Sequence, residues 1–81
     1  MSKFKIVEVY SKGCLACDYA YRLMKKIGIY DNITHIENSD SIKNELKTNK
    51  VPTFFIYYND KIVKKIQDID RVKIEDLKRY I

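Results

Sequence analysis

The sequence is short of the residues that mark several large classes of protein. Its 81 residues include no tryptophan, one proline, one histidine, two glycines and two cysteines. The longest uninterrupted apolar run, Phe54 to Tyr58, is far shorter than the roughly 18 residues that a membrane-spanning helix needs. Lys3, Lys5 and Glu8 interrupt the amino-terminal stretch, which therefore has no apolar signal core. We expect one soluble, cytoplasmic domain over residues 1–81.

Charge of one sign is not concentrated anywhere in the chain. Sixteen Lys and Arg against eleven Asp and Glu give a net charge of +5, with acidic residues interspersed among the basic ones. There is no arginine-rich block and no aromatic RNA-binding signature, so nucleic-acid binding is disfavoured. A hydrophobic fraction of 46% and a charged fraction of 33% are close to globular averages, which argues against wholesale disorder.

The two cysteines, Cys14 and Cys17, lie three positions apart. A secreted scaffold of this size usually carries more cysteines, spread along the chain to join distant loops. A bridge between Cys14 and Cys17 would close a very short loop, so it would add little of the loop entropy that makes structural disulfides useful. The pair is therefore better explained by chemistry than by a structural role.

The cysteines lie where a predicted strand turns into a predicted helix. Residues 4–10 are β-branched and aromatic, residues 11–13 form a turn, and apolar residues then recur at helical spacing up to Ile27. Cys14 is predicted at or just before the first helical residue, where unpaired N–H groups and the helix dipole stabilise an anion. Because the thiolate is the attacking species in disulfide exchange, this position favours a reactive Cys14, and Lys12 adds a nearby positive charge.

The remaining pattern predicts an α/β fold. Further elements are predicted as a short strand within residues 31–37, a helix over 42–47, strands over 53–58 and 61–66, and a final helix after Asp70. The apolar positions of that final helix are Val72, Ile74, Leu77 and Ile81. The order β-α-β-α-β-β-α implies a central mixed four-stranded sheet with helices on both faces.

With a CxxC at the first strand-to-helix turn and Val51-Pro52 opening the third strand, the chain resembles the thioredoxin/glutaredoxin superfamily over essentially its whole length. More narrowly, it resembles a small glutaredoxin-like thioredoxin with a Cys-Leu-Ala-Cys active site. The resemblance implies a thioredoxin-like fold in which Cys14 is the nucleophile and Cys17 the resolving cysteine. It also implies that Pro52 is cis and packs against the cysteines, and that the backbone of Val51 pairs with an extended substrate.

The two branches of the superfamily each match part of the sequence. The lead-in Tyr10-Ser11-Lys12 is similar to that of glutaredoxins, where the lysine helps to hold a glutathione carboxylate, and Tyr10 is a candidate for lining the substrate groove. Glutaredoxins follow the hairpin with Gly-Gly-x-Asp, whereas residues 67–70 here are Gln-Asp-Ile-Asp, which should crowd and repel glutathione. Thioredoxins lack that glycine pair but carry a tryptophan before their first cysteine, and this chain has none.

Glu8 is a further match to thioredoxins, which carry a buried carboxylate six residues before the nucleophile. By resemblance, Glu8 would accept a proton from Cys17, and a buried acid can act as a base near neutrality. The alternative is that Glu8 lies near a strand end and reaches solvent, and the sequence leaves both open. His35, on the predicted second strand, is interpreted as structural.

These patterns lead to a thiol–disulfide oxidoreductase that reduces protein or small-molecule disulfides through Cys14 and Cys17. It would bind no cofactor and no metal, work as a monomer, and draw electrons from a thioredoxin-reductase-type flavoenzyme or from glutathione. The alternative is a metal or iron–sulfur module. It would need a dimer or an added small thiol, because two thiolates make half of a four-ligand site.

Overall fold

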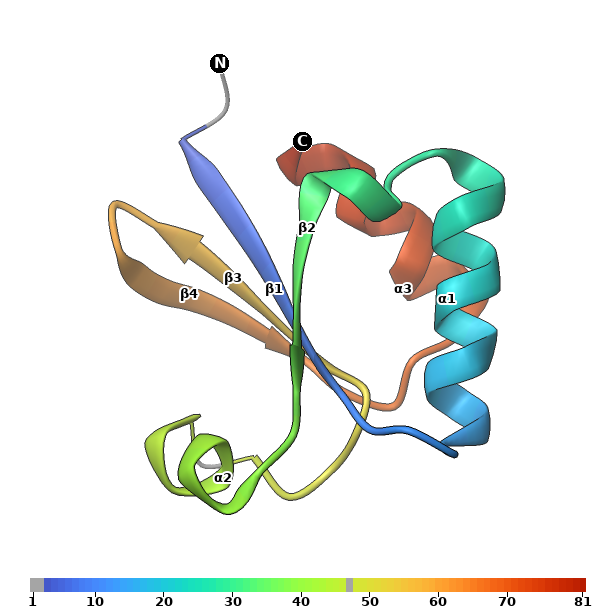
Figure 1. Cartoon of the computed structure of the whole chain (residues 1–81). Coiled ribbons are helices and arrows are strands. Elements are labelled where there is room, and N and C mark those ends of the chain that lie inside the picture. The colour runs from blue at the N-terminus through green and yellow to red at the C-terminus, as the bar shows by residue number, and fades with distance from the viewer. Residues whose placement is uncertain (1–2, 47) are drawn as a thin grey trace.

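The computed structural model describes residues 3–46 and 48–81, and along these residues the elements follow the predicted order (Figure 1). The strands are β1 (Phe4–Tyr10), β2 (Ile33–Glu37), β3 (Thr53–Tyr58) and β4 (Lys61–Ile66). The helices are α1 (Leu15–Ile27), α2 (Asp40–Leu46) and α3 (Arg71–Asp76), and the short 3-10 turns are η1 (Tyr30–Asn32) and η2 (Leu77–Tyr80).

The strands form one mixed sheet in the order β2-β1-β3-β4. β1 pairs in parallel with β2 and antiparallel with β3, and β3 pairs antiparallel with β4. Asn59 and Asp60 turn the β3–β4 hairpin with positive φ values of 51° and 65°, the geometry of a tight turn that matches the twist of its strands. This is the α/β, thioredoxin-like sheet that the sequence predicted.

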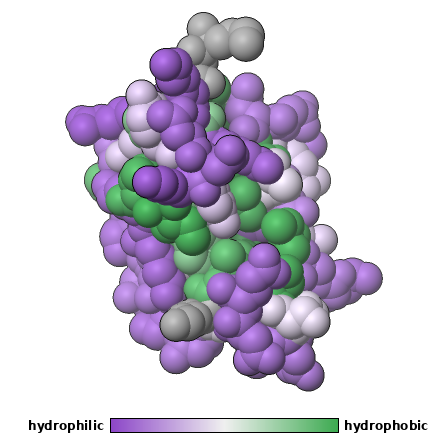
Figure 2. Space-filling view, turned by 90° about the vertical axis from the view of Figure 1, so that its left-hand side faces the viewer, coloured by the Kyte–Doolittle hydropathy of each residue, from purple (hydrophilic) through white to green (hydrophobic). Residues whose placement is uncertain are grey.

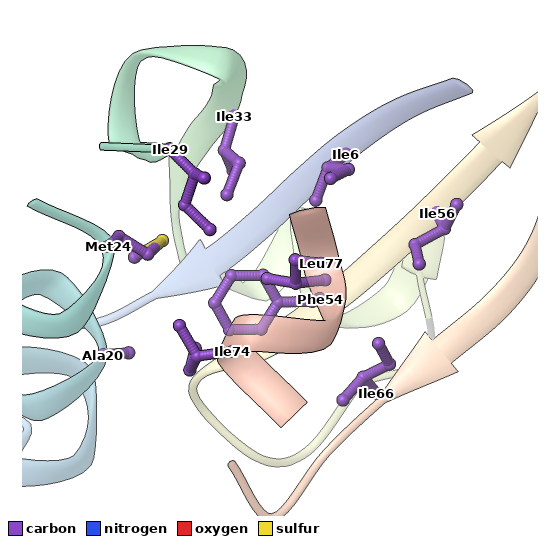
Figure 3. Packing of buried hydrophobic residues seen from close by; sticks show 10 residues of the cluster. All are labelled: Ile6, Ala20, Met24, Ile29, Ile33, Phe54, Ile56, Ile66, Ile74 and Leu77. Atoms are coloured by element: carbon purple, nitrogen blue, oxygen red, sulfur yellow. The ribbon is translucent and has the colours of Figure 1, made fainter. Parts of the chain in front are cut away.

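Helices cover both faces of the sheet, with α1 and α3 on one side and α2 on the other (Figure 1). The larger core lies under α1 and α3 (Figure 3) and consists of Ile6, Ala20, Met24, Ile29, Ile33, Phe54, Ile56, Ile66, Ile74 and Leu77. The smaller core lies toward α2 and consists of Val7, Val9 and Phe55. Because the central strands β1 and β3 are covered on both faces, their sequences are almost continuously apolar.

On the face seen in Figure 2, apolar side chains remain visible between hydrophilic ones. A hollow of about 300 Å³ on the α2 side of the sheet is lined by residues of the sheet and of α2, including Val7, Ile36, Ile42 and Leu46. This surface lies on the opposite face of the sheet from α1 and the cysteines.

Side chains and a glycine cap the helix ends. Asp70 accepts a hydrogen bond from the Lys73 N–H at 2.8 Å at the start of α3, and the Ser39 hydroxyl accepts one from the Ile42 N–H at 3.3 Å before α2. Gly28 ends α1 in the left-handed conformation, with φ of 78°, which glycine adopts without steric cost.

Two of the apolar positions of the final helix are exposed, and α2 has different bounds from those predicted. Val72 is 73% exposed and Ile81 is 44% exposed, whereas Ile74 and Leu77 are fully buried. Val72 precedes Ile74 by two residues, about 200° around a helix, so the two side chains cannot share a face. α2 begins at Asp40, earlier than predicted, and the predicted last residue, Lys47, lies outside the described residues.

No helix in the described part of the chain is both long and apolar enough to cross a membrane.

Candidate active site

Cys14 is the N-cap of α1. Its backbone is extended, with φ of −92° and ψ of 118°, and its sulfur accepts a hydrogen bond from the Cys17 N–H at 3.1 Å. Its carbonyl accepts the first helical hydrogen bond, from the Asp18 N–H at 3.0 Å. The side chain is partly exposed. The sulfur therefore lies where the helix start stabilises negative charge and where a substrate can still reach it.

Cys17 lies one turn further on and is only 6% exposed. Burial, followed by a hydrogen bond with the Cys14 side chain, raises its pKa from 9.0 to about 12, and the nearby charges of Cys14 and Glu8 act in the same direction. Cys17 therefore stays a thiol at neutral pH until a base removes its proton. Cys14 is thus the accessible cysteine of the pair and Cys17 the buried one.

The loop before β3 closes over the cysteines. The Val51–Pro52 peptide bond is cis, as the resemblance implied. The Cys14 thiol donates a long hydrogen bond to the Val51 carbonyl, with 3.8 Å between sulfur and oxygen. A groove of about 360 Å³ runs beside this loop and is lined by Ala16, Lys50, Val51, Pro52, Asp68 and Ile69.

Two buried threonines hold this loop in place. The Thr53 hydroxyl donates to the Lys50 carbonyl at 2.6 Å and lies 3.0 Å from the Thr48 hydroxyl. Thr53 is fully buried and Thr48 is 2% exposed. These bonds satisfy polar groups that burial has removed from water, so they tie the Lys50–Pro52 turn to the start of β3.

Glu8 lies inside the protein at the middle of β1, with 3% of its surface exposed. Of the two alternatives left by the sequence, the buried one is therefore correct. Glu8 and Cys17 line the same cavity of about 240 Å³, together with Tyr10, Tyr21, Tyr30 and His35. This cavity is separate from the groove beside Pro52.

His35 is the residue that the sequence interpretation missed. It is paired with Glu8 across β1 and β2, and its Nδ1 lies 2.5 Å from the Glu8 Oε1. Its Nε2 lies 3.0 Å from the Tyr30 carbonyl oxygen. Burial lowers the pKa of His35, but the hydrogen bonds to Glu8 and Tyr30 and the charges of Glu8 and Asp31 outweigh burial, so the pKa ends above 6.5.

The other candidate residues are distributed around these two spaces. Tyr10 lines the cavity that contains Glu8, not the groove beside Pro52. Lys12 is exposed in the turn before Cys14, and Tyr19 is 46% exposed on the surface of α1. Of the Cys14–Cys17 segment, Cys17 lines the cavity and Ala16 lines the groove.

The loop after β4 carries a charged residue at a left-handed backbone position. Asp68 adopts φ of 54°, a left-handed conformation that favours glycine. Its carboxylate lies 3.4 Å from the Lys50 Nζ, and the two side chains face each other across exposed surface beside the groove. Lys73 donates to the carbonyls of Gln67 and Asp68 at 2.9 and 3.0 Å, which holds the loop in this shape.

Within residues 3–46 and 48–81, no group of three or more His, Cys, Asp or Glu side chains is placed to hold a metal ion.

Solved structures with the same fold include thioredoxins. The chain superposes on reduced thioredoxin pre-protein of Schistosoma mansoni with a TM-score of 0.76 at 24% identity, over 99% of this chain and 81% of the other. It superposes on a thioredoxin of Nicotiana alata with a TM-score of 0.75 at 14% identity, covering 99% and 75%. For thioredoxin of Malassezia sympodialis the TM-score is 0.74 at 17% identity, covering 98% and 76%.

By sequence, no protein-family model and no curated protein matches the chain. The structural likeness shows that the chain has the thioredoxin fold, with a Cys-x-x-Cys pair at the start of its first described helix. At these identities the neighbours establish the fold, and the chemistry has to be argued from the site itself.

Proposed function

We propose that this protein is a thiol–disulfide oxidoreductase that reduces disulfides by a dithiol mechanism. The observation that carries the proposal is the pairing of a partly exposed Cys14 sulfur at a helix start with a buried Cys17 whose N–H hydrogen-bonds to that sulfur at 3.1 Å. A structural disulfide does not require one accessible and one protected sulfur, whereas a nucleophile and a resolving thiol do.

In the first step, the Cys14 thiolate attacks one sulfur of a substrate disulfide. A bond forms between Cys14 and that sulfur, and the second substrate sulfur leaves as a thiolate and takes up a proton. The Cys17 N–H and the start of α1 stabilise the anionic form of Cys14 before the attack.

In the second step, Cys17 loses its proton and attacks the Cys14 sulfur of the mixed disulfide. The first substrate sulfur leaves as a thiolate, and two electrons have then passed from the protein to the substrate. We propose Glu8 as the acceptor of the Cys17 proton, through the cavity that both residues line. The Cys14–Cys17 disulfide that remains has to be reduced by an external two-electron donor.

For the substrate we propose an extended polypeptide carrying a disulfide, seated in the groove beside Val51 and Pro52. The exposed Asp68 carboxylate at this groove disfavours glutathione, which carries carboxylates of its own. We therefore propose a thioredoxin-reductase-type flavoenzyme, in preference to glutathione, as the electron donor. No bound cofactor is needed for either step.

Trapping of the mixed disulfide tests the proposal. The Cys17→Ser variant should form a stable mixed disulfide between Cys14 and a disulfide-bonded peptide, because the resolving thiol is missing. Cys14→Ser is the matched control and should form none, since the nucleophile is missing. Trapping by Cys14→Ser alone would reverse the two roles. A metal-bridged dimer that requires both thiols, with no trapping by either variant, would contradict the proposal.

A further inference from the structure

The contact between Glu8 and His35 joins the two strands of the βαβ unit, the central strand β1 and the edge strand β2, inside the protein. The side chain of Glu8 is 4% exposed and that of His35 is 14% exposed. The His35 ring stacks on the Tyr30 ring, with 4.0 Å between centroids and 18° between planes, and the Lys25 Nζ lies 4.3 Å from the Tyr30 ring centroid. Stacking on Tyr30 and a hydrogen-bond partner at each ring nitrogen therefore hold the imidazole in one orientation.

The hydrogen-bond partners of His35 determine how many protons the pair carries. The Tyr30 carbonyl can only accept, so the Nε2 atom at 3.0 Å from it must carry a hydrogen. The Nδ1 atom faces a carboxyl oxygen at 2.5 Å, so one proton must lie between these two atoms. Without it, two lone pairs would face each other. The pair thus holds one shared proton, as carboxylate with imidazolium or as carboxylic acid with neutral imidazole.

The imidazolium form leaves Glu8 as a carboxylate whose charge is balanced inside the protein. If the imidazole were absent, a carboxylate 3% exposed would have no cation beside it, and such a group takes up a proton from solvent instead of remaining charged. A Glu8 that is already protonated cannot accept the proton of Cys17. His35 is thus the group that keeps a base available in the cavity.

We propose that Glu8 and His35 form one proton-exchanging unit for Cys17, in which His35 is the positioning residue that keeps Glu8 able to accept the proton released when Cys17 attacks the mixed disulfide. This inference rests on the proposed oxidoreductase function. The proton passes from the Cys17 sulfur to Glu8 through the shared cavity and later returns to solvent, so the unit is regenerated in each cycle.

The pH dependence of this unit involves groups from three elements that pack around His35. These groups are Glu8 and Tyr10 on β1, Cys17, Tyr21 and Lys25 on α1, and Tyr30 and Asp31 on η1. The charges of Glu8 and Asp31 favour the imidazolium form of His35. The unit therefore titrates as a coupled group rather than as an isolated histidine.

A two-step reaction with the aryl disulfide dithiobis(nitrobenzoate) separates the step that needs the unit from the step that does not. Attack by Cys14 releases one coloured thiolate in a phase that depends on reagent concentration. Attack by Cys17 releases the second coloured thiolate, in a phase whose rate does not depend on reagent concentration. Because the leaving aryl thiolate needs no proton at neutral pH, the second phase reports on the loss of the Cys17 proton.

We expect His35→Gln to slow the second phase at least about tenfold between pH 6 and 8, a part of the ~10²–10⁴ that general base catalysis contributes. The first phase should change less than about twofold. Thr34→Ala, at the exposed neighbouring position of β2, is the control and should leave both phases unchanged. His35→Lys should recover most of the second-phase rate and lose the inflection above pH 6.5, because lysine supplies a cation that does not titrate in this range.

Equal second phases in wild type and His35→Gln would overturn the proposal, as would equal slowing of both phases. A second phase that stays slow in His35→Lys would also overturn the proposal. It would mean that the shape of the imidazole ring, and not its positive charge, sets the rate of the second phase. These outcomes differ from failure of the proposed function, in which the wild-type protein itself releases no second thiolate and forms no Cys14–Cys17 disulfide.

Nitrogen NMR on the wild-type protein keeps the proposal testable even if the His35 variants do not fold. His35 is the only histidine in the sequence, so its ring signals are unambiguous. We expect Nε2 to be protonated at pH 7 and the titration midpoint of His35 to lie above that of the Glu8→Gln variant. An unprotonated Nε2, or an identical midpoint in Glu8→Gln, would overturn the proposal.

Discussion

Unfolding the chain should make Cys17 about a thousandfold more reactive toward an alkylating reagent at neutral pH. In the folded protein, burial and the hydrogen bond with Cys14 raise the pKa of Cys17 from 9.0 to about 12. Alkylation requires the thiolate, whose fraction well below the pKa falls tenfold for each unit by which the pKa rises, which gives a factor of roughly 10³. The 6% exposure of Cys17 adds to this protection.

Timed alkylation with iodoacetamide at pH 7.5, with and without urea, measures the factor directly. Trypsin leaves both cysteines on one peptide, residues 13–22, so fragmentation in the mass spectrometer must assign each label to Cys14 or Cys17. In urea the two cysteines should react at rates within a few-fold of each other. In the folded protein the label should appear first on Cys14.

A Cys17 that reacts in the folded protein within about tenfold of its rate in urea would refute this reasoning. In that case burial would not be keeping the resolving cysteine protonated, and no internal base would be needed to activate it. Labelling of Cys17 ahead of Cys14 would also contradict the assignment of Cys14 as the accessible nucleophile.

Three further predictions concern the loop, the groove and the buried pair. Thr53→Val should lower the free energy of unfolding by about 0.5–1.5 kcal/mol in urea titrations, because the Lys50 carbonyl loses one of its two donors and keeps only the Thr48 hydroxyl; an unchanged midpoint would contradict this. Asp68→Gly should raise the rate of reduction of glutathione disulfide relative to that of a peptide disulfide. Asp68→Asn removes the charge but keeps a side chain at this position, so it separates the effect of charge from that of φ. Equal rate ratios in wild type and both variants would show that Asp68 does not determine the choice of substrate. Burial lowers the pKa of His35 but the Glu8 hydrogen bond outweighs it, so protonated His35 stabilises the fold below about pH 6.5 and this contribution is lost as pH rises through the raised pKa. Unfolding free energies measured from pH 6 to 8 should therefore decline in wild type and not in His35→Gln, and parallel curves would refute the linkage.

The order of elements and the position of the cysteines could be predicted because they depend on local patterns. The strand over residues 4–10 is apolar on both faces, and the helix after Cys14 has apolar residues at helical spacing, so the strand-to-helix turn can be located without tertiary information. The cis conformation of the Val51–Pro52 bond could not be predicted from a local pattern. It followed from the family resemblance, since few X–Pro bonds are cis.

The Glu8–His35 pair could not be predicted in the same way because it depends on strand register. Both residues were placed on strands that a βαβ unit brings together, yet a shift of one residue would move His35 to the opposite face. The observed register pairs Glu8 with His35 directly, and it depends on where η1 ends and β2 begins. A lone histidine on an outer strand carries no local signal of such a contact.

A redox titration of the Cys14–Cys17 couple tests the central claim most directly. The protein would be equilibrated with glutathione buffers of defined potential, quenched by alkylation and measured by mass spectrometry. We predict a reversible intramolecular disulfide with a potential in the range of about −270 to −200 mV that thioredoxins and glutaredoxins span, toward the lower value for a thioredoxin-type donor. If no intramolecular disulfide forms at any potential, the dithiol mechanism is wrong.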